Sequence, residues 1–131
     1  MKNKGFTLIE LLAVIVILAI IALIATPIIL GIINDARNSA KERTAELIAN
    51  EVELAYTGYM YKNNGNEPTD FCTYMAPTYF TMDKGTLGSC ANDQVTVTSG
   101  GIEYIVKPGT TAGTVEVSYT GGTTKTVTLT K

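Results

Sequence analysis

The feature that most constrains this chain is an apolar run from Leu11 to Ile33, 23 residues without a charged side chain. As an α-helix rising about 1.5 Å per residue, the run is roughly 34 Å long, enough to cross the hydrocarbon core of a bilayer. It is apolar all the way round, so it has no polar face to turn toward water. A chain of 131 residues has no soluble core large enough to surround such a helix. We therefore expect a membrane-spanning helix.

The residues on either side of the run predict its orientation. Lys2 and Lys4 precede it, so the positive-inside rule places the N-terminus in the cytoplasm and everything after Ile33 outside. A secretory signal peptide fits poorly, because its apolar region has about 7–15 residues and ends at a small-residue cleavage site. The run here is longer, and residues 34–37 contain no such site. An uncleaved signal anchor remains an alternative.

Composition excludes several classes of function. The chain has no His, which rules out Ser-His-Asp and Cys-His catalysis and imidazole metal sites. With 10 Lys and Arg against 12 Asp and Glu, the net charge is -2, and a nucleic-acid-binding surface would need clustered basic residues. Phosphate-binding loops, EF-hands and zinc-ligand spacings are also lacking from the sequence. We expect neither an enzyme nor a protein with a metal or cofactor, and no binding of nucleic acid by the chain itself.

Three features distinguish the N-terminal segment from a plain anchor. A short basic leader ends at Gly5, and Phe6 opens the apolar region. Glu10 is the only charged residue between Lys4 and Asp35, and a carboxylate inside a membrane helix costs about 2.5–3.5 kcal/mol on insertion scales, which indicates a functional role. Pro27 removes a helical hydrogen bond, and Gly31 follows one turn later, so we expect a kink or a loosened helix there.

The segment GFTLIE at residues 5–10, followed by a long apolar helix that contains Pro27, resembles the processing site and N-terminal helix of type IV pilins. The resemblance covers roughly the first third of the chain. It implies that a prepilin peptidase cleaves between Gly5 and Phe6 at the cytoplasmic face and N-methylates Phe6. It also implies that a membrane platform protein and a cytoplasmic ATPase drive assembly.

Cleavage would give Glu10 a partner. The new α-amine of Phe6 is mostly cationic at neutral pH, and both charges would lie in apolar surroundings where each alone is costly. Pairing Glu10 of one subunit with Phe6 of a neighbour would satisfy both and fix the axial register. Two alternatives stay open: Glu10 pairs within its own chain, or it reaches the membrane interface.

The remainder of the chain predicts an α+β pilin fold. We expect one helix from about residue 7 to about residue 61, because residues 34–62 contain no Pro and carry apolar side chains at helical spacing. Its amphipathic half, residues 34–62, would pack against a four-stranded antiparallel β-meander within residues 95–130. The apolar helix positions are Ala36, Ala40, Leu47, Ile48, Val52, Ala55 and Tyr59. The strand-like runs, which alternate apolar and polar residues, are Val95–Thr98, Ile102–Lys107, Thr114–Tyr119 and Lys125–Thr130.

Residues 63–94 predict a variable, irregular loop that contains both cysteines. On the exported side, Cys72 and Cys90 would form a disulfide, closing a loop of about 19 residues and contributing roughly 3 kcal/mol. Two free thiols are the alternative. In many Gram-negative pilins the cysteine pair instead brackets a C-terminal loop, whereas this chain ends on a strand-like run.

These inferences give three parts: a cleaved leader at 1–5, an apolar transmembrane and filament-core helix at 6–33, and a globular headgroup at 34–131. The resemblance implies a major pilin, located in the cytoplasmic membrane before assembly and in an extracellular homo-oligomeric filament afterwards, serving adhesion, twitching motility or aggregation. One alternative is a pseudopilin of a type II secretion or competence DNA-uptake system. The other is a single-pass surface protein that does not polymerise.

Overall fold

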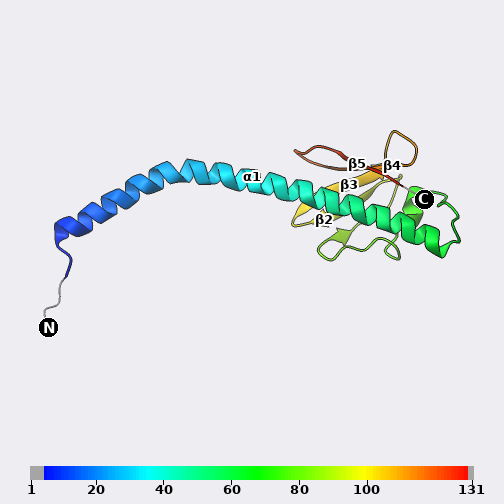
Figure 1. Cartoon of the computed structure of the whole chain (residues 1–131), viewed down its shortest axis with the longest axis horizontal. Coiled ribbons are helices and arrows are strands. Elements are labelled where there is room, and N and C mark those ends of the chain that lie inside the picture. The colour runs from blue at the N-terminus through cyan, green and yellow to red at the C-terminus, as the bar shows by residue number, and fades with distance from the viewer. Residues whose placement is uncertain (1–4, 130–131) are drawn as a thin grey trace. The chain divides into compact units, whose positions relative to one another are not determined.

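The computed structural model describes residues 5–129, and the chain forms two compact units, Met1–Asn38 and Ser39–Lys131. The first unit consists of the N-terminal part of α1 (Leu8–Lys62) and the short segment before it. The second, here called the C-terminal unit, holds the remainder of α1 and the other elements (Figure 1). The bounds of α1 agree within one residue with the helix expected from the sequence. From the return of charged residues, the sequence predicted a division between residues 33 and 34. The boundary between the two compact units lies five residues later, between residues 38 and 39.

The N-terminal part of α1 presents its apolar side chains to the outside. The large apolar residues from Leu8 to Ile33 are all exposed, and none of the most apolar stretch is buried within the chain. By length and composition α1 is the one helix among residues 5–129 that could cross a membrane. No tertiary contact explains why these residues are apolar, so their surroundings must be provided by something other than this chain.

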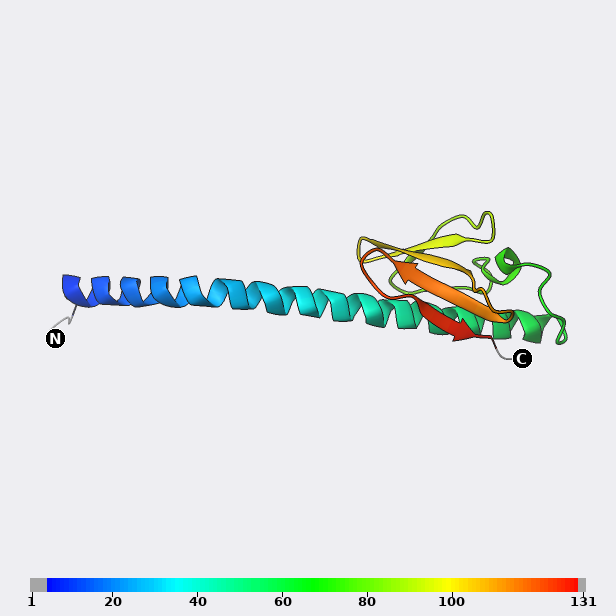
Figure 2. The ribbon, with the colours of Figure 1, turned by 90° about the horizontal axis from the view of Figure 1, so that it is seen from above.

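In the C-terminal unit, the antiparallel sheet covers one side of α1 (Figures 1 and 2). Its strand order follows the chain, β1-β2-β3-β4-β5, which makes it a simple meander. The other elements are α2 (Phe71–Tyr74), β1 (Thr86–Leu87), β2 (Val95–Ser99), β3 (Ile102–Pro108), β4 (Thr114–Tyr119) and β5 (Lys125–Thr128). The predicted α+β pilin fold is confirmed.

The core lies between the sheet and one face of α1. The helix contributes Ala45, Ile48, Ala49, Val52, Ala55 and Tyr56. The sheet contributes alternate residues of its central strands: Val95, Val97, Tyr104, Val106, Val115, Val117 and Tyr119. These strand positions are the ones that the period-2 pattern assigned to the apolar face. Of the positions expected in the apolar stripe, Ile48, Val52 and Ala55 are buried and Tyr59 is half-buried, whereas Ala36, Ala40 and Leu47 are exposed. Leu47 lies about 100° around the helix from its buried neighbour Ile48.

The sheet has five strands, so the expectation of four was wrong. The additional strand, β1, lies in the segment expected to be irregular and pairs with β2 through Thr86↔Thr98 and Leu87↔Val97. Two residues are too few to show an alternating pattern, which is why the sequence did not indicate it. The last strand ends at Thr128. Its expected end, Thr130, lies outside the described residues.

The segment between helix and sheet also closes the core. Phe71, Tyr74, Met75 and Phe80 are buried, and the ring of Tyr74 packs edge-on against Tyr56 of α1 with centroids 5.4 Å apart. The segment predicted as a variable loop therefore packs into the core of the C-terminal unit.

Candidate processing and assembly site

The residues around the expected cleavage point lie in an open segment. Gly5, Phe6 and Thr7 are not helical and are exposed, with 84% of the Phe6 side chain accessible. A Cβ atom added at Gly5 would meet no other atom within 4 Å. Nothing within the described chain therefore blocks access to the peptide bond between Gly5 and Phe6, as the predicted cleavage requires.

The helix immediately after this segment starts with a capping box. The Thr7 N–H donates to Glu10 Oε2 at 3.1 Å, and the Glu10 N–H donates to Thr7 Oγ1 at 3.2 Å. The Leu11 N–H then donates to the Thr7 carbonyl at 3.1 Å, which is the first helical hydrogen bond. This reciprocal arrangement satisfies two backbone donors that a helix start otherwise leaves unpaired. A carboxylate in the first turn also interacts favourably with the helix dipole.

The capping box shows where the proposed register residues lie. Glu10 is one helical turn from Phe6, and within its own chain the carboxylate bonds to Thr7. Contact between Glu10 and the Phe6 amine of a neighbour requires a second copy. Sequence reasoning overlooked Thr7, although the spacing Thr-x-x-Glu is itself a recognised signature of a helix start.

Pro27 and Gly31 lie inside α1, which remains an α-helix through both positions. Just before the proline, the Thr26 hydroxyl donates to the Ala22 carbonyl at 2.6 Å. Such back-bonding by Thr uses a carbonyl of the helix ladder and often accompanies bending. The helix is continuous through Pro27 in the isolated chain. A kink or loosening at Pro27 and Gly31, in the single subunit or in a filament, stays a prediction.

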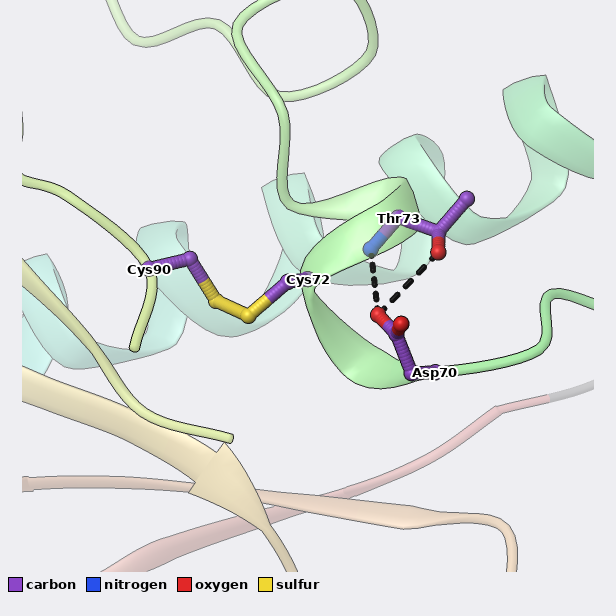
Figure 3. Close-up of a disulfide and its surroundings, with 4 residues drawn as sticks. All are labelled: Asp70, Cys72, Thr73 and Cys90. Atoms are coloured by element: carbon purple, nitrogen blue, oxygen red, sulfur yellow. Dashed lines mark hydrogen bonds between the residues drawn. A yellow bond between two sulfur atoms is a disulfide. The ribbon is translucent and has the colours of Figure 1, made fainter. Parts of the chain in front are cut away.

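The two cysteines are joined by a disulfide, with Cα atoms 5.6 Å apart (Figure 3). Cys72 lies on α2, whose start is capped by Asp70: the Thr73 N–H and hydroxyl donate to Asp70 Oδ1 at 3.0 and 3.1 Å (Figure 3). Cys90 lies in the segment before β2. The bridge therefore ties α2 to the chain that enters the sheet.

Two buried tyrosines in the C-terminal unit have perturbed ionisation. Burial raises the pKa of Tyr74 above its usual value, and the nearby Tyr56 and Asp93 raise it further. Burial also raises the pKa of Tyr119, with Glu42 adding to the effect. The larger of the two shifts is that of Tyr74, which packs in the core, so this shift bears on stability at high pH. Within residues 5–129, no group of three or more Cys, Asp or Glu side chains is placed to hold a metal ion.

Comparison with known proteins agrees with the geometry at the N-terminus. Residues 1–26 match the family model described as the prokaryotic N-terminal methylation motif, the processing motif of type IV pilins and prepilins. No curated protein and no solved structure matches the chain. The matched segment contains the Gly5–Phe6 bond, the capping box and the first 16 of the 23 residues of the apolar run.

Proposed function

We propose that this chain is a structural subunit of a type IV pilus, the major pilin, and that it polymerises through its apolar N-terminal helix. The observation that carries the proposal is the methylation motif at residues 1–26. That motif supports a type IV pilin-like or pseudopilin protein in general. The fold agrees, because an exposed apolar helix precedes a self-contained α+β unit. Proteins with this motif are structural, and no catalysis is assigned to the chain.

In the proposed pathway, the precursor is anchored in the cytoplasmic membrane by residues 6–33, and prepilin peptidase removes residues 1–5 and methylates Phe6. The apolar helices then leave the bilayer and pack against one another, with the headgroups of residues 34–131 outside. Packing of the helices against one another keeps them shielded from water outside the bilayer, where each large aliphatic side chain left exposed would cost about 1.5–3 kcal/mol. Pairing of Glu10 with a neighbour's Phe6 amine would set the register.

A pseudopilin of a secretion or competence system is the second candidate, because it would share the same motif and helix. A non-polymerising anchored protein is the third. The three differ in what shearing releases from cells: long, abundant filaments for a major pilin, and little or nothing for the others. Adhesion, twitching motility and aggregation are the roles we propose for such a filament.

Intact-mass measurement of protein sheared from cells, without reduction, tests the proposal. We expect a chain that starts at N-methyl-Phe6 and is recovered in filaments. The variant Gly5→Leu should block processing and release. Because a side chain at Gly5 meets nothing within the folded chain, this effect would arise at the peptidase. Ala112→Leu is the matched control, since it places the same side chain on an exposed turn of the C-terminal unit, away from the motif. Recovery of an unprocessed Met1 start, with nothing released by shearing, would refute the proposal.

A further inference from the structure

The C-terminal unit exposes large apolar side chains only on its helix. Beyond Ile33, the large apolar residues that are exposed in the described chain are Leu47, Leu54 and Tyr61, with exposed fractions of 57%, 63% and 87%. All three lie on α1, and none lies on the sheet or the loops. The exposed large apolar side chains of the C-terminal unit therefore lie only on α1, the helix whose N-terminal part is also apolar and exposed.

These three residues form one stripe. They are seven residues apart, so each lies within about 20° of the last around the helix, and the stripe runs along the face that points away from the core. Gly58 lies between Leu54 and Tyr61, and a Cβ added there would meet nothing within 4 Å. It leaves a gap in the stripe that an apolar side chain from outside would fill. One apolar position every seven residues is half of the a/d pattern by which helices pack along one another.

Opposite charges flank the stripe. Arg43 precedes Leu47 by four residues and Glu51 follows it by four, so they lie about 40° to either side of Leu47. Neither has an ion-pair partner within the described residues, where the recorded pair is Lys125 with Glu46. The two charges are eight residues apart, or about 12 Å along the helix axis.

We propose that the stripe of Leu47, Leu54 and Tyr61 docks against the same stripe of a second, parallel copy of this chain, displaced by seven to eight residues. This proposal rests on the proposed filament function and names a contact within it. At that displacement, Leu47 of one copy lies level with Leu54 of the next, and Leu54 lies level with Tyr61. The same displacement brings Arg43 of one copy level with Glu51 of the next.

Charge and position identify the occupant as another copy. The stripe is self-complementary, because its basic flank fits its own acidic flank and its leucines fit its own repeat. The displaced contact is heterologous, because different residues of the two copies meet: Leu47 and Arg43 of one copy lie level with Leu54 and Glu51 of the next. The stripe also belongs to the helix whose exposed apolar half is proposed to form the filament core.

Charge reversal and rescue test the contact in cells that produce the full-length chain. Arg43→Glu and Glu51→Arg should each lower the yield of sheared filaments about tenfold, because like charges then face each other across the contact. The double variant should restore the yield to within about twofold of the unmodified chain, since the pair is re-formed with its signs exchanged. Glu103→Arg is the matched control: it changes charge as Glu51→Arg does, on an exposed position of β3.

The outcomes separate this contact from the function on which it rests. Filaments of normal yield from both single variants, or equal losses in the singles and the double, would overturn the stripe contact and leave the filament proposal intact. Absence of filaments and of a Phe6 start in the unmodified chain would overturn both. The tyrosine circular dichroism of the purified variants reports whether the C-terminal unit is folded, so a loss of yield with an altered spectrum would count against the contact.

Discussion

Removing the disulfide tests whether the segment between α2 and β2 depends on its covalent tie. The variant Cys72→Ala/Cys90→Ala opens a loop closed by residues 18 positions apart in sequence. In the chain-entropy model, a closed loop of that size restricts the unfolded chain by about 11 cal/mol/K, or roughly 3 kcal/mol at 25 °C. Because small domains are stable by about 5–15 kcal/mol, this loss is a large fraction of the total.

Buried side chains of the same segment also hold it to the core, in addition to the disulfide. Phe71, Tyr74 and Phe80 are buried in the core, and we expect them to stay buried when the bridge is removed. Alanine keeps an apolar side chain at both half-buried cysteine positions and introduces no unpaired hydroxyl. We therefore expect the variant to fold to the same structure with a lower free energy of unfolding.

The aromatic residues of the chain provide a selective assay. It has no Trp, and its seven Tyr residues all lie in the C-terminal unit, so tyrosine circular dichroism reports unfolding of that unit alone. Guanidinium unfolding of the full chain in mild detergent should show a midpoint shift equivalent to about 3 kcal/mol. Reducing the unmodified chain should produce the same shift. A change below about 1 kcal/mol would refute the reasoning that the bridge constrains the unfolded state.

Three further predictions concern the C-terminal unit. The raised pKa of Tyr74 means that the folded state holds its proton more tightly than the unfolded state, so this stability is full below the ordinary value of 10.0 and is lost as pH rises above it. Tyr74→Phe should therefore flatten the fall in unfolding midpoint between pH 9 and about 11.5; an unchanged slope would contradict the shift. Gly122→Ala should destabilise by at least about 1–3 kcal/mol, because its Cβ would overlap the ring of Tyr119; thermal unfolding measures this, and equal stability would show that the ring moves aside. Ile48→Ala should cost about 2–5 kcal/mol by denaturant unfolding, because Ile48 is fully buried between α1 and the sheet; a cost under 1 kcal/mol would place it outside the core.

Regular patterns in the sequence predicted the regular elements. Absence of proline from residues 34–62 and apolar spacing near 3.6 predicted the second half of α1 to within one residue. Alternation predicted the four longer strands, and in β2, β3 and β4 each buried side chain is followed by a more exposed one. The alternate residues of β5 are only half-buried. The helix face was predicted less well, since Leu47 and Ile48 are adjacent apolar residues and only one of them can face the sheet.

Features without a period could not be predicted in the same way. β1 has two residues, and the buried aromatic residues around α2 follow no helical or strand spacing. These aromatic residues are buried because the segment around α2 packs against α1 and the sheet, and such tertiary packing leaves no periodic pattern in the sequence. At the N-terminus, the charge of Glu10 indicates a functional residue by itself, whereas Thr7 can be predicted only from the Thr-x-x-Glu spacing of a capping box.

The capping box changes how the proposed pairing of Glu10 should be understood. Isolated in an apolar medium, the carboxylate would have to find its partner in another subunit or remain costly. In the structure, Oε2 already accepts the Thr7 N–H, while Oε1 accepts no hydrogen bond within the described chain. An ionised carboxylate has about four acceptor positions, so one oxygen keeps the cap while the other is free for a cation. The proposed contact with a neighbour's Phe6 amine then adds a bond without breaking the helix start. The same side chain would stabilise the single subunit in the membrane and set the register in the filament.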